Sequence, residues 1–169
     1  MRKMPIMPMR HTRGFTLVEA TMSTLIVSIL IVCAVRVAGA NGVAQYKTAE
    51  RGTARFLADG LLNDISCLPY EDPNVTPLFG RESGETSASK ANYDDIDDFD
   101  GWSESPPQYR DGSQIPNETS WRRTVKVERV SPSDLSVQST ETGAKRITVT
   151  VLHNNVTVIS RAVIRTRAS

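Results

Sequence analysis

The chain of 169 residues contains two cysteines and two histidines, and aromatic residues make up 6% of it. Cys33 and Cys67 are too few to build a disulfide framework. With a helix between them they would lie about 50 Å apart at 1.5 Å per residue, far beyond the reach of a disulfide bond. We therefore expect ordinary thiols, buried or facing lipid, with a bond from Cys67 to a second molecule as the alternative.

Residues for enzymatic chemistry are equally scarce. His11 lies in a basic N-terminal segment, and His153 flanks a predicted hairpin turn. The sequence shows no nucleophile beside a base, no metal-ligand spacing and no phosphate-binding loop. We therefore expect a protein that is not an enzyme.

Charge is abundant but segregated along the chain, although the formal net charge is only +1. Residues 1–14 carry four bases and no acid. Residues 69–118 hold twelve acids against three bases, and residues 121–169 hold nine bases against three acids. The distribution, rather than the near-neutral total, therefore indicates how the chain is organised.

One long apolar run follows the basic N-terminal segment. Residues 20–35, ATMSTLIVSILIVCAV, contain no charge, and the run extends over residues 15–40 with Glu19 and Arg36 as its interruptions. A helix of this length crosses a hydrocarbon core of about 30 Å. The bases ahead of it favour a cytoplasmic N-terminus, so we expect a single-pass anchor in the inner membrane with the C-terminal part in the periplasm.

A secretory signal peptide is the competing interpretation, since a basic segment precedes an apolar one. The run is longer than a typical signal core, and VAGANG at residues 37–42 is the nearest approach to a small-x-small cleavage site. Glu19 also lies where such a core is purely apolar. A charge costs about 2.5–3.5 kcal/mol at the centre of a membrane helix and less near an interface, so Glu19 either snorkels to the headgroups or has a use.

The segment RGFTLVE, Arg13 to Glu19, resembles the class III signal of type IV pilins and of the pseudopilins of type II secretion. The match consists of a short basic leader, a glycine, a phenylalanine and a glutamate fifth after the glycine, followed at once by the apolar helix. The resemblance implies that an aspartic prepilin peptidase cleaves between Gly14 and Phe15, and that the new amine of Phe15 is N-methylated. It also implies that Glu19 neutralises the N-terminal amine of a neighbouring subunit in a filament, where either charge alone is costly.

The helix is expected to continue beyond the membrane. Apolar residues recur at spacings of three and four, at Ala54, Leu57, Leu61, Ile65 and Leu68. This stripe predicts an amphipathic helix that ends before Pro69. We expect one helix from about residue 15 to 67, with a soft point near residues 39–42. A separate amphipathic helix after a loop is the alternative.

The patterns predict five segments along the chain. Residues 1–14 form the cleaved leader, 15–40 the transmembrane and filament-core helix, and 41–68 its amphipathic continuation. Residues 69–120 form an acidic region rich in proline and glycine, and residues 121–169 an antiparallel sheet. The predicted class is therefore α+β, with a long N-terminal helix packed on a small antiparallel sheet and a long acidic loop between them.

The acidic run NYDDIDDFDGW, residues 92–102, is the most concentrated charge in the loop region. Its aspartates are Asp94, Asp95, Asp97, Asp98 and Asp100. Such a cluster repels itself unless it is solvated or bridged by a cation, and clustered carboxylates suit Ca²⁺. The run is not an EF-hand, because Ile96 occupies the first ligand position. It resembles a stretch of some minor pilins. Two interpretations remain: a Ca²⁺ site formed by these aspartates, or a solvated acidic loop with little regular structure.

The last third of the chain is predicted to be β. Residues 121–130 alternate, with Val125 and Val127 on one face, and residues 145–167 predict a hairpin that turns at Asn154–Asn155. The predicted register pairs His153 with Val156, Val151 with Val158, Val149 with Ser160, and Ile147 with Ala162.

Basic residues accompany these strands: Arg122, Arg123, Lys126, Arg129, Lys145, Arg146, Arg161 and Arg165. Aromatic residues do not alternate with them, apart from Trp121. A solvated outer face of the sheet is therefore favoured over a surface that binds nucleic acid.

Together these features lead us to expect a minor pilin or pseudopilin, a structural subunit of a type II secretion pseudopilus or a type IV pilus. Its partners would be prepilin peptidase, other subunits and the inner membrane, and Ca²⁺ is the one cofactor considered. The C-terminal part lacks the disulfide-closed loop of many major pilins, which favours a minor subunit. The alternatives are a filament-tip binding module, as an adhesin or a DNA-uptake receptor, and a plain single-pass membrane protein.

Overall fold

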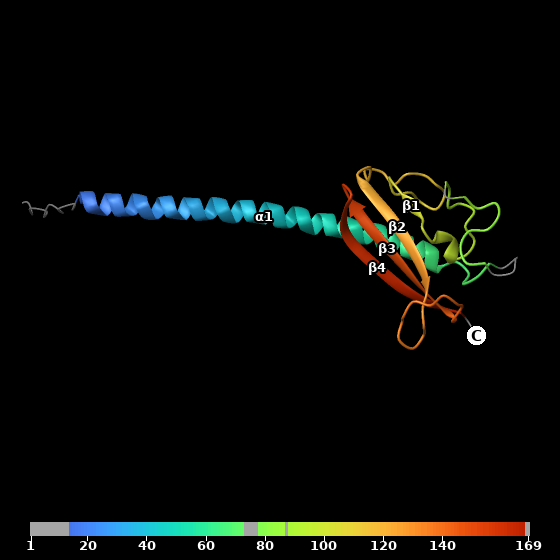
Figure 1. Cartoon of the computed structure of the whole chain (residues 1–169). Helices are drawn as coiled ribbons and strands as arrows, with labels where there is room; N and C mark the ends of the chain where they lie inside the picture. The colour runs from blue at the N-terminus through green and yellow to red at the C-terminus, as the bar shows by residue number, and fades with distance from the viewer. Residues whose placement is uncertain (1–13, 73–77, 87, 168–169) are drawn as a thin grey trace, which may run out of the picture. The chain divides into compact units, whose positions relative to one another are not determined.

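The computed structural model of the protein describes residues 14–72, 78–86 and 88–167. Its elements are helix α1 (Leu17–Ser66), the 3-10 helix η1 (Asp97–Phe99), and strands β1 (Ser103–Glu104), β2 (Trp121–Arg129), β3 (Ala144–His153) and β4 (Val156–Thr166). The four strands form one antiparallel sheet in the order β1-β2-β3-β4 (Figure 1). The predicted α+β class is therefore confirmed. The chain divides into two units, one ending at Tyr46 and one beginning at Lys47.

Helix α1 is capped at its N-terminus by its own sequence. Thr16 precedes the first helical residue, and its Oγ1 accepts a hydrogen bond from the backbone N–H of Glu19 at 3.2 Å. This bond satisfies one of the N–H groups that the first turn of a helix leaves free. The helix passes without interruption through residues 39–42, where the sequence predicted a soft point, and ends three residues before Pro69.

The first half of α1 is long and apolar enough to cross a membrane. Every residue from 14 to 49 is exposed. The hydroxyl groups of this segment bond to the carbonyls of the preceding turn, Ser23 to Glu19 and Ser28 to Thr24, each at 2.7 Å. A hydroxyl satisfied in this way enters lipid without leaving an unpaired polar group. The segment is therefore suited to serve as a single membrane anchor.

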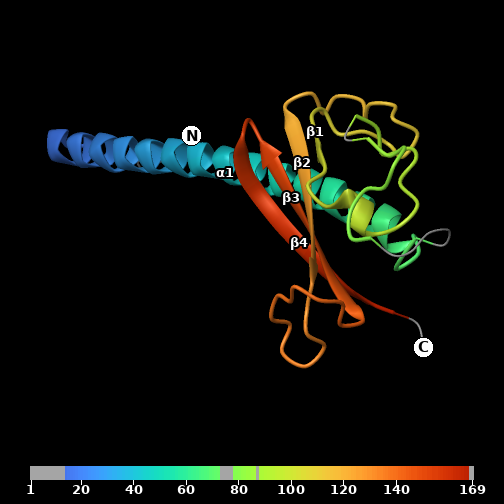
Figure 2. The same cartoon turned by 45° about the vertical axis from the view of Figure 1, so that its right-hand side comes forward.

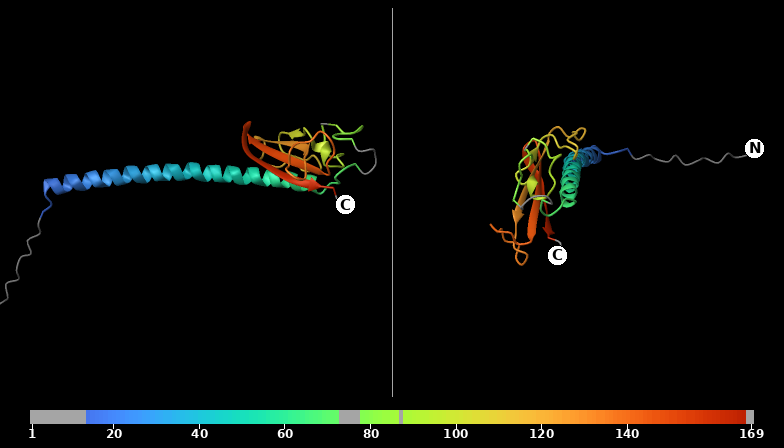
Figure 3. Two further views of the ribbon diagram at one scale, coloured as in Figure 1. Left: turned by 60° about the horizontal axis from the view of Figure 1, so that its bottom comes forward. Right: turned by 90° about the vertical axis from the view of Figure 1, so that its right-hand side faces the viewer.

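The second half of α1 supplies one wall of the hydrophobic core. The predicted stripe is confirmed, and the buried helical residues are Ala54, Leu57, Ala58, Leu61, Leu62 and Ile65. The same cluster contains inward-facing residues of the sheet, Val125, Val127, Ile147, Val149 and Val151. Strands β2, β3 and β4 cross this part of the helix in Figure 2, and the helix and the sheet form two layers in Figure 3. Removing each such leucine, isoleucine or valine side chain from water stabilises the fold by about 1.5–3 kcal/mol.

Strands β3 and β4 form the predicted hairpin. Asn154 and Asn155 have φ values of 50° and 64°, the left-handed values that a tight two-residue hairpin turn needs. His153 pairs with Val156, as predicted. The two-residue turn predicted at Asn154–Asn155 is therefore the turn that forms.

Beyond the turn the predicted register is wrong by one residue, because β4 contains a bulge between Leu152 and Val151 of its partner. The observed pairs are Leu152–Thr157, Val151–Ile159, Val149–Arg161 and Ile147–Val163, in place of Val151–Val158, Val149–Ser160 and Ile147–Ala162. A bulge adds one residue to one strand and exchanges the two faces beyond it. Here it turns Ile159 and Val163 against the core.

The acidic run between α1 and β2, residues 92–102, is not the solvated loop that one interpretation of the sequence predicted. Tyr93, Ile96, Phe99 and Trp102 are buried in the core. The Tyr93 ring meets the rings of Phe99 and Trp102 edge-on, with centroids 4.9 and 5.5 Å away. These four residues recur at every third position, which is the period of the 3-10 helix that η1 forms among them. The acidic run is therefore part of the core rather than a solvated loop.

A buried carboxylate joins this segment to the sheet. Glu104 on β1 pairs with Lys90 (Nζ···Oε2 2.7 Å) and with Arg123 on β2 (Nε···Oε1 2.6 Å). It also accepts a hydrogen bond from the indole N–H of Trp102 at 3.2 Å. Arg123 donates in addition to the carbonyl of Leu57 on α1 at 3.0 Å. Charges that would be costly alone thus satisfy one another, while burial lowers the pKa of the Lys90 ammonium.

Two of the bases predicted for the outer face of the sheet point inward instead. Arg123 and Lys145 are buried, whereas Arg122 and Lys126 are exposed as predicted. Each buried base has a buried acidic partner, which makes its position inside the protein tolerable.

Replacing Glu104 with alanine should destabilise the fold strongly, because the charges of Lys90 and Arg123 would remain buried without a partner. We expect the free energy of unfolding to fall by about 3–5 kcal/mol. Urea unfolding of the full chain in detergent micelles measures this, followed by the fluorescence of the two tryptophans, Trp102 and Trp121, which are both buried.

Asp59→Ala is the matched control. Asp59 also pairs with two bases, Arg55 and Arg161, but its side chain is 43% exposed. Exposed pairs contribute about 0–1 kcal/mol. Equal losses in the Asp59 and Glu104 variants would contradict the role given to the buried carboxylate.

Candidate functional site

Gly14 and Phe15, the predicted cleavage point, lie immediately ahead of α1. Both residues are exposed, Phe15 to 82%. A Cβ atom added to Gly14 would meet no atom within 4 Å. Packing around Gly14 therefore does not require a glycine at this position. The rest of the predicted leader, residues 1–13, lies outside the described residues.

Glu19 is exposed in the first turn of α1. The stretch Thr16-Leu17-Val18-Glu19 fits a capping box, with threonine at the N-cap and glutamate three residues on. The sequence TLVE, residues 16–19, displays this pattern, so the cap could have been predicted from the sequence. A carboxylate here also interacts favourably with the positive end of the helix dipole. Glu19 thus has a local role in its own helix in addition to any role in pairing with a second chain.

Three aspartates of the acidic run are buried, with exposures of 1% for Asp95, 2% for Asp97 and 0% for Asp98. Asp98 Oδ2 accepts hydrogen bonds from the backbone N–H groups of Asp94 and Asp95 at 3.0 and 3.1 Å. Asp95 Oδ1 accepts from the N–H groups of Asp97 and Asp98 at 2.8 and 3.2 Å. The two side chains therefore satisfy the backbone of the run. The solvated interpretation is wrong for these residues, although Asp94 itself is exposed.

Asp97 and Asp100 attach the run to its surroundings. Asp97 pairs with the buried Lys145 of β3 and accepts a hydrogen bond from the N–H of Gly80 at 3.1 Å. Asp100 accepts from the N–H of Val127 on β2 at 2.9 Å. These carboxylates have protein partners, so the structure does not gather the five predicted aspartates around one cation.

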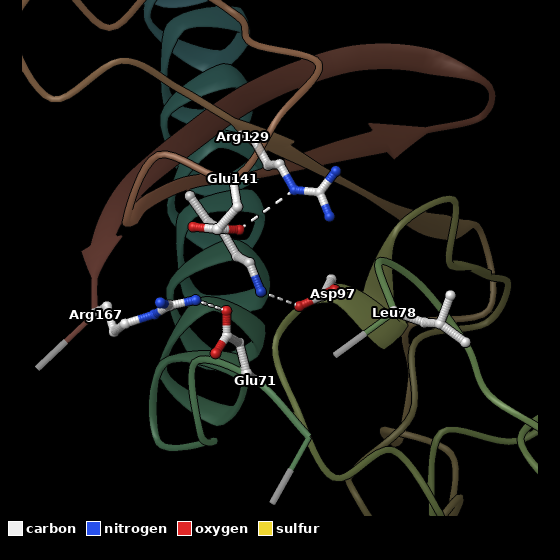
Figure 4. A pocket seen from close by; sticks show the side chains of 7 residues that line it. Glu71, Leu78, Asp97, Arg129, Glu141 and Arg167 are labelled. Atoms are coloured by element: carbon white, nitrogen blue, oxygen red, sulfur yellow. Dashed lines mark hydrogen bonds and ion pairs between the residues drawn. The ribbon is translucent and has the colours of Figure 1, made fainter. Parts of the chain in front are cut away.

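A pocket of about 220 Å³ lies beside Asp97 (Figure 4). It is lined by Glu71, Leu78, Asp97, Arg129, Glu141, Lys145 and Arg167. Each acid of this lining has a basic partner, Glu141 with Arg129 at 3.3 Å, Asp97 with Lys145, and Glu71 with Arg167. The charges of the described lining residues balance, so none of these residues is left unmatched to attract a ligand.

Tyr70 completes this network. Its hydroxyl donates to Glu141 Oε1 at 2.7 Å, and Lys145 Nζ lies 4.3 Å from the centre of its ring. Burial, together with the hydrogen bond to Glu141, raises the pKa of the Tyr70 hydroxyl. The network therefore joins the chain after α1 to β3, and its role is structural.

The carboxylates that do converge are those of Glu82, Glu85 and Asp98, each of which offers an oxygen within 4.8 Å of the other two. Glu82 and Glu85 were not predicted as ligands from the sequence, because they lie ahead of the acidic run and only the fold brings them to Asp98. Burial raises the pKa of Glu85 to about 7, and the nearby Asp98 charge acts in the same direction. These are the residues most suited to hold a metal in the described part of the chain.

A hydrogen-bonded chain of Glu50, His153 and Ser120 corrects the expectation that no nucleophile lies beside a base. His153 Nδ1 lies 2.6 Å from Glu50 Oε1, and Nε2 lies 3.1 Å from Ser120 Oγ. Catalysis by such a chain also needs N–H groups that receive an oxyanion. The N–H groups of Trp121 and Asn154 donate instead to the carbonyls of Glu118 and Ser120, at 3.2 and 3.0 Å.

The Trp121 ring stacks on the His153 ring, with centroids 4.4 Å apart. The arrangement thus fastens the end of the β3–β4 hairpin to α1 through Glu50. That the protein is not an enzyme stays a prediction.

The free thiols Cys33 and Cys67 are not bonded to each other, as predicted, but Cys67 is exposed rather than buried.

Among the bases of the sheet, Arg146 pairs with Glu128 at 2.7 Å and Arg161 with Asp59 at 3.1 Å. That the sheet does not bind nucleic acid also stays a prediction.

No protein-family model, no curated protein and no solved structure matches the chain.

The raised pKa of Asp95 predicts a pH-dependent stability. Burial and the charges of Asp97 and Asp98 raise the pKa of Asp95 to about 7, against about 3.9 in an unfolded chain. Between these values the folded state binds more protons than the unfolded state, so this group stabilises the fold at pH 5 and loses that contribution as the pH rises through 7. Asparagine resembles the protonated acid at every pH. We therefore expect the Tm of Asp95→Asn, relative to the original chain, to rise from pH 5 to pH 8 in the presence of a chelator.

Thermal unfolding followed by circular dichroism measures this difference, with Asp111→Asn as the control. Asp111 is exposed, and its hydrogen bonds with Ser113 hold its pKa below the ordinary value, so it stays ionised throughout this range. Its Tm difference should not change with pH. A flat difference for Asp95→Asn would contradict the raised pKa of Asp95.

Proposed function

We propose that the chain is a pilin-like filament subunit, a minor pilin or pseudopilin of a type IV pilus or a type II secretion pseudopilus. The observation that carries the proposal is the RGFTLVE segment, which leads into the first turn of a helix whose first half is apolar and exposed and whose second half packs on a sheet. The apolar surface of this first half has no partner among the described residues of its own chain. Lipid covers that surface in a precursor, and neighbouring helices cover it in a filament.

The surroundings of the scissile bond support processing by prepilin peptidase. Gly14 and Phe15 are exposed ahead of the first helical residue, so the peptide bond between them is accessible. The described residues leave open space around Gly14, which fits a demand for glycine that comes from the peptidase rather than from packing. A residue without a side chain lets a catalytic site approach the backbone closely. Cleavage on the cytoplasmic face of the inner membrane leaves residues 15–169, with the Phe15 amine free for methylation.

Glu19 would direct assembly. Helices that leave lipid for a bundle gain little from the hydrophobic effect, because lipid tails are as apolar as the helices. A specific polar pair therefore decides the register, and the carboxylate of Glu19 with the Phe15 amine of a neighbouring subunit forms such a pair. Stacking out of step by one turn would leave both charges without a partner.

The replacement Gly14→Val should leave the fold unchanged and block processing. The precursor should accumulate at full length in the inner membrane, whereas the original chain should begin at Phe15. Immunoblotting of membrane fractions and N-terminal sequencing measure both outcomes in cells that contain prepilin peptidase. Gly52→Ala is the control, because a Cβ there also meets no atom within 4 Å. An N-terminus near residue 40 would identify an ordinary signal peptide and overturn the proposal.

The replacement Glu19→Gln tests assembly separately from helix capping. Glutamine serves in a capping box as glutamate does, so only the charge is lost. We expect Glu19→Gln to be inserted and cleaved normally but to copurify poorly with filaments, by about tenfold or more if the pair contributes 1.4 kcal/mol or more. Thr16→Ala is the converse control, since it removes the cap and keeps the carboxylate. Normal recovery of Glu19→Gln in filaments would refute the pairing role.

A further inference from the structure

Two short segments that both contact Tyr93 meet at a group of carboxylates. Glu82 and Glu85 come from the segment after Gly80, and Asp98 comes from η1. One oxygen from each lies within 4.8 Å of the others. Two oxygens bound to one Ca²⁺ at about 2.4 Å are at most about 4.8 Å apart, so each pair of these carboxylates is close enough to share a cation.

Asp98 supplies an independent indication of a ligand. Its side chain is fully buried, and Oδ2 is held by the N–H groups of Asp94 and Asp95. Its other oxygen, Oδ1, is buried and has no hydrogen-bond partner among the described residues. Glu82 Oε1 is likewise buried and has no hydrogen-bond partner among the described residues. Buried polar atoms are almost always paired, so two orphaned oxygens in one group of acids indicate a missing positive partner.

The protein does not place a base on these oxygens in the described part of the chain. Arg81, the adjacent residue in sequence, donates to the hydroxyl of Tyr93 at 3.2 Å and to the backbone carbonyl of Asp98 at 3.3 Å. Glu85 Oε2 accepts from the N–H of Glu82 at 3.1 Å, which fixes the turn between the two glutamates.

We propose that Glu82, Glu85 and Asp98 bind one Ca²⁺ ion, which ties the segment at residues 81–86 to the acidic run. The ligand set consists of carboxylates alone, without histidine or cysteine, and so selects a hard cation. Ca²⁺ accepts about six to eight oxygens in irregular geometry, and the half-exposed glutamates leave room for water. Mg²⁺ demands near-ideal octahedral geometry and gives up its water reluctantly.

The site differs from the one expected from sequence. The acidic run suggested five aspartates as ligands, but four of them, Asp94, Asp95, Asp97 and Asp100, lie outside the convergent group. Asp94 is the useful comparison, because it is exposed and belongs to the run. The site also does not depend on filament assembly, since all its ligands lie in the unit that begins at Lys47.

Thermal unfolding of the full chain in detergent micelles tests the proposal, with CaCl₂ or MgCl₂ titrated after treatment with chelator. We expect Ca²⁺ to raise the Tm saturably, with a Kd of about 10⁻⁴–10⁻³ M and one ion bound per chain by equilibrium dialysis. Glu85→Gln and Glu82→Gln, whose side chains are half-exposed, should keep the fold by circular dichroism and raise the Kd at least tenfold. Asp94→Asn should bind Ca²⁺ as the original chain does.

Two results would overturn the proposal. One is an equal rise in Tm with MgCl₂, or no rise with either salt. The other is an equal Ca²⁺ response in the Glu85→Gln variant, or a loss as large in Asp94→Asn as in Glu85→Gln. In the last case the charge of the run as a whole, rather than the convergent group, would attract the ion.

Discussion

The buried carboxylate of Glu104 holds together three parts of the chain that are distant in sequence. Lys90 brings the segment ahead of η1, and Arg123 brings β2 and reaches the carbonyl of Leu57 on α1. Each of these charges would be costly in the core without the others. The loop, the sheet and the helix are therefore stable together rather than separately. This constraint also fixes where the acidic run lies, because the run joins Lys90 to Glu104.

The acidic run is both highly charged and buried, because its apolar and acidic residues have different roles. Large apolar side chains at every third position enter the core, and the aspartates between them accept hydrogen bonds from backbone N–H groups or pair with Lys145. Carboxylates used in this way are not free to bind a metal. Asp98 keeps one oxygen without a partner, and Asp98 is the residue that meets Glu82 and Glu85. The proposed Ca²⁺ site thus uses the Asp98 oxygen that no backbone N–H group binds.

The two halves of α1 meet different environments. The first half is apolar on all sides and has its hydroxyls bonded to its own carbonyls, which suits lipid or a bundle of like helices. The second half has one buried stripe and charged residues elsewhere, and it packs on the sheet. A filament subunit requires both properties in one chain. The proposed function therefore gives each half of α1 a purpose, and it assigns Gly14 and Glu19 to processing and assembly.

Local pattern determined much of this protein. The apolar run, the stripe that includes Leu57 and Leu61, and the Asn154–Asn155 turn are properties of neighbouring residues, and they appear in the structure as predicted. The helix cap formed by TLVE, residues 16–19, could be recognised from neighbouring residues in the same way. Tertiary contacts decided the rest. The β4 bulge could not be predicted, because apolar residues occupy both faces of the strand and packing selects between them. The burial of Arg123, Lys145 and Asp98 could not be predicted either. A charge is tolerated inside a protein only when a partner from elsewhere in the chain lies beside it.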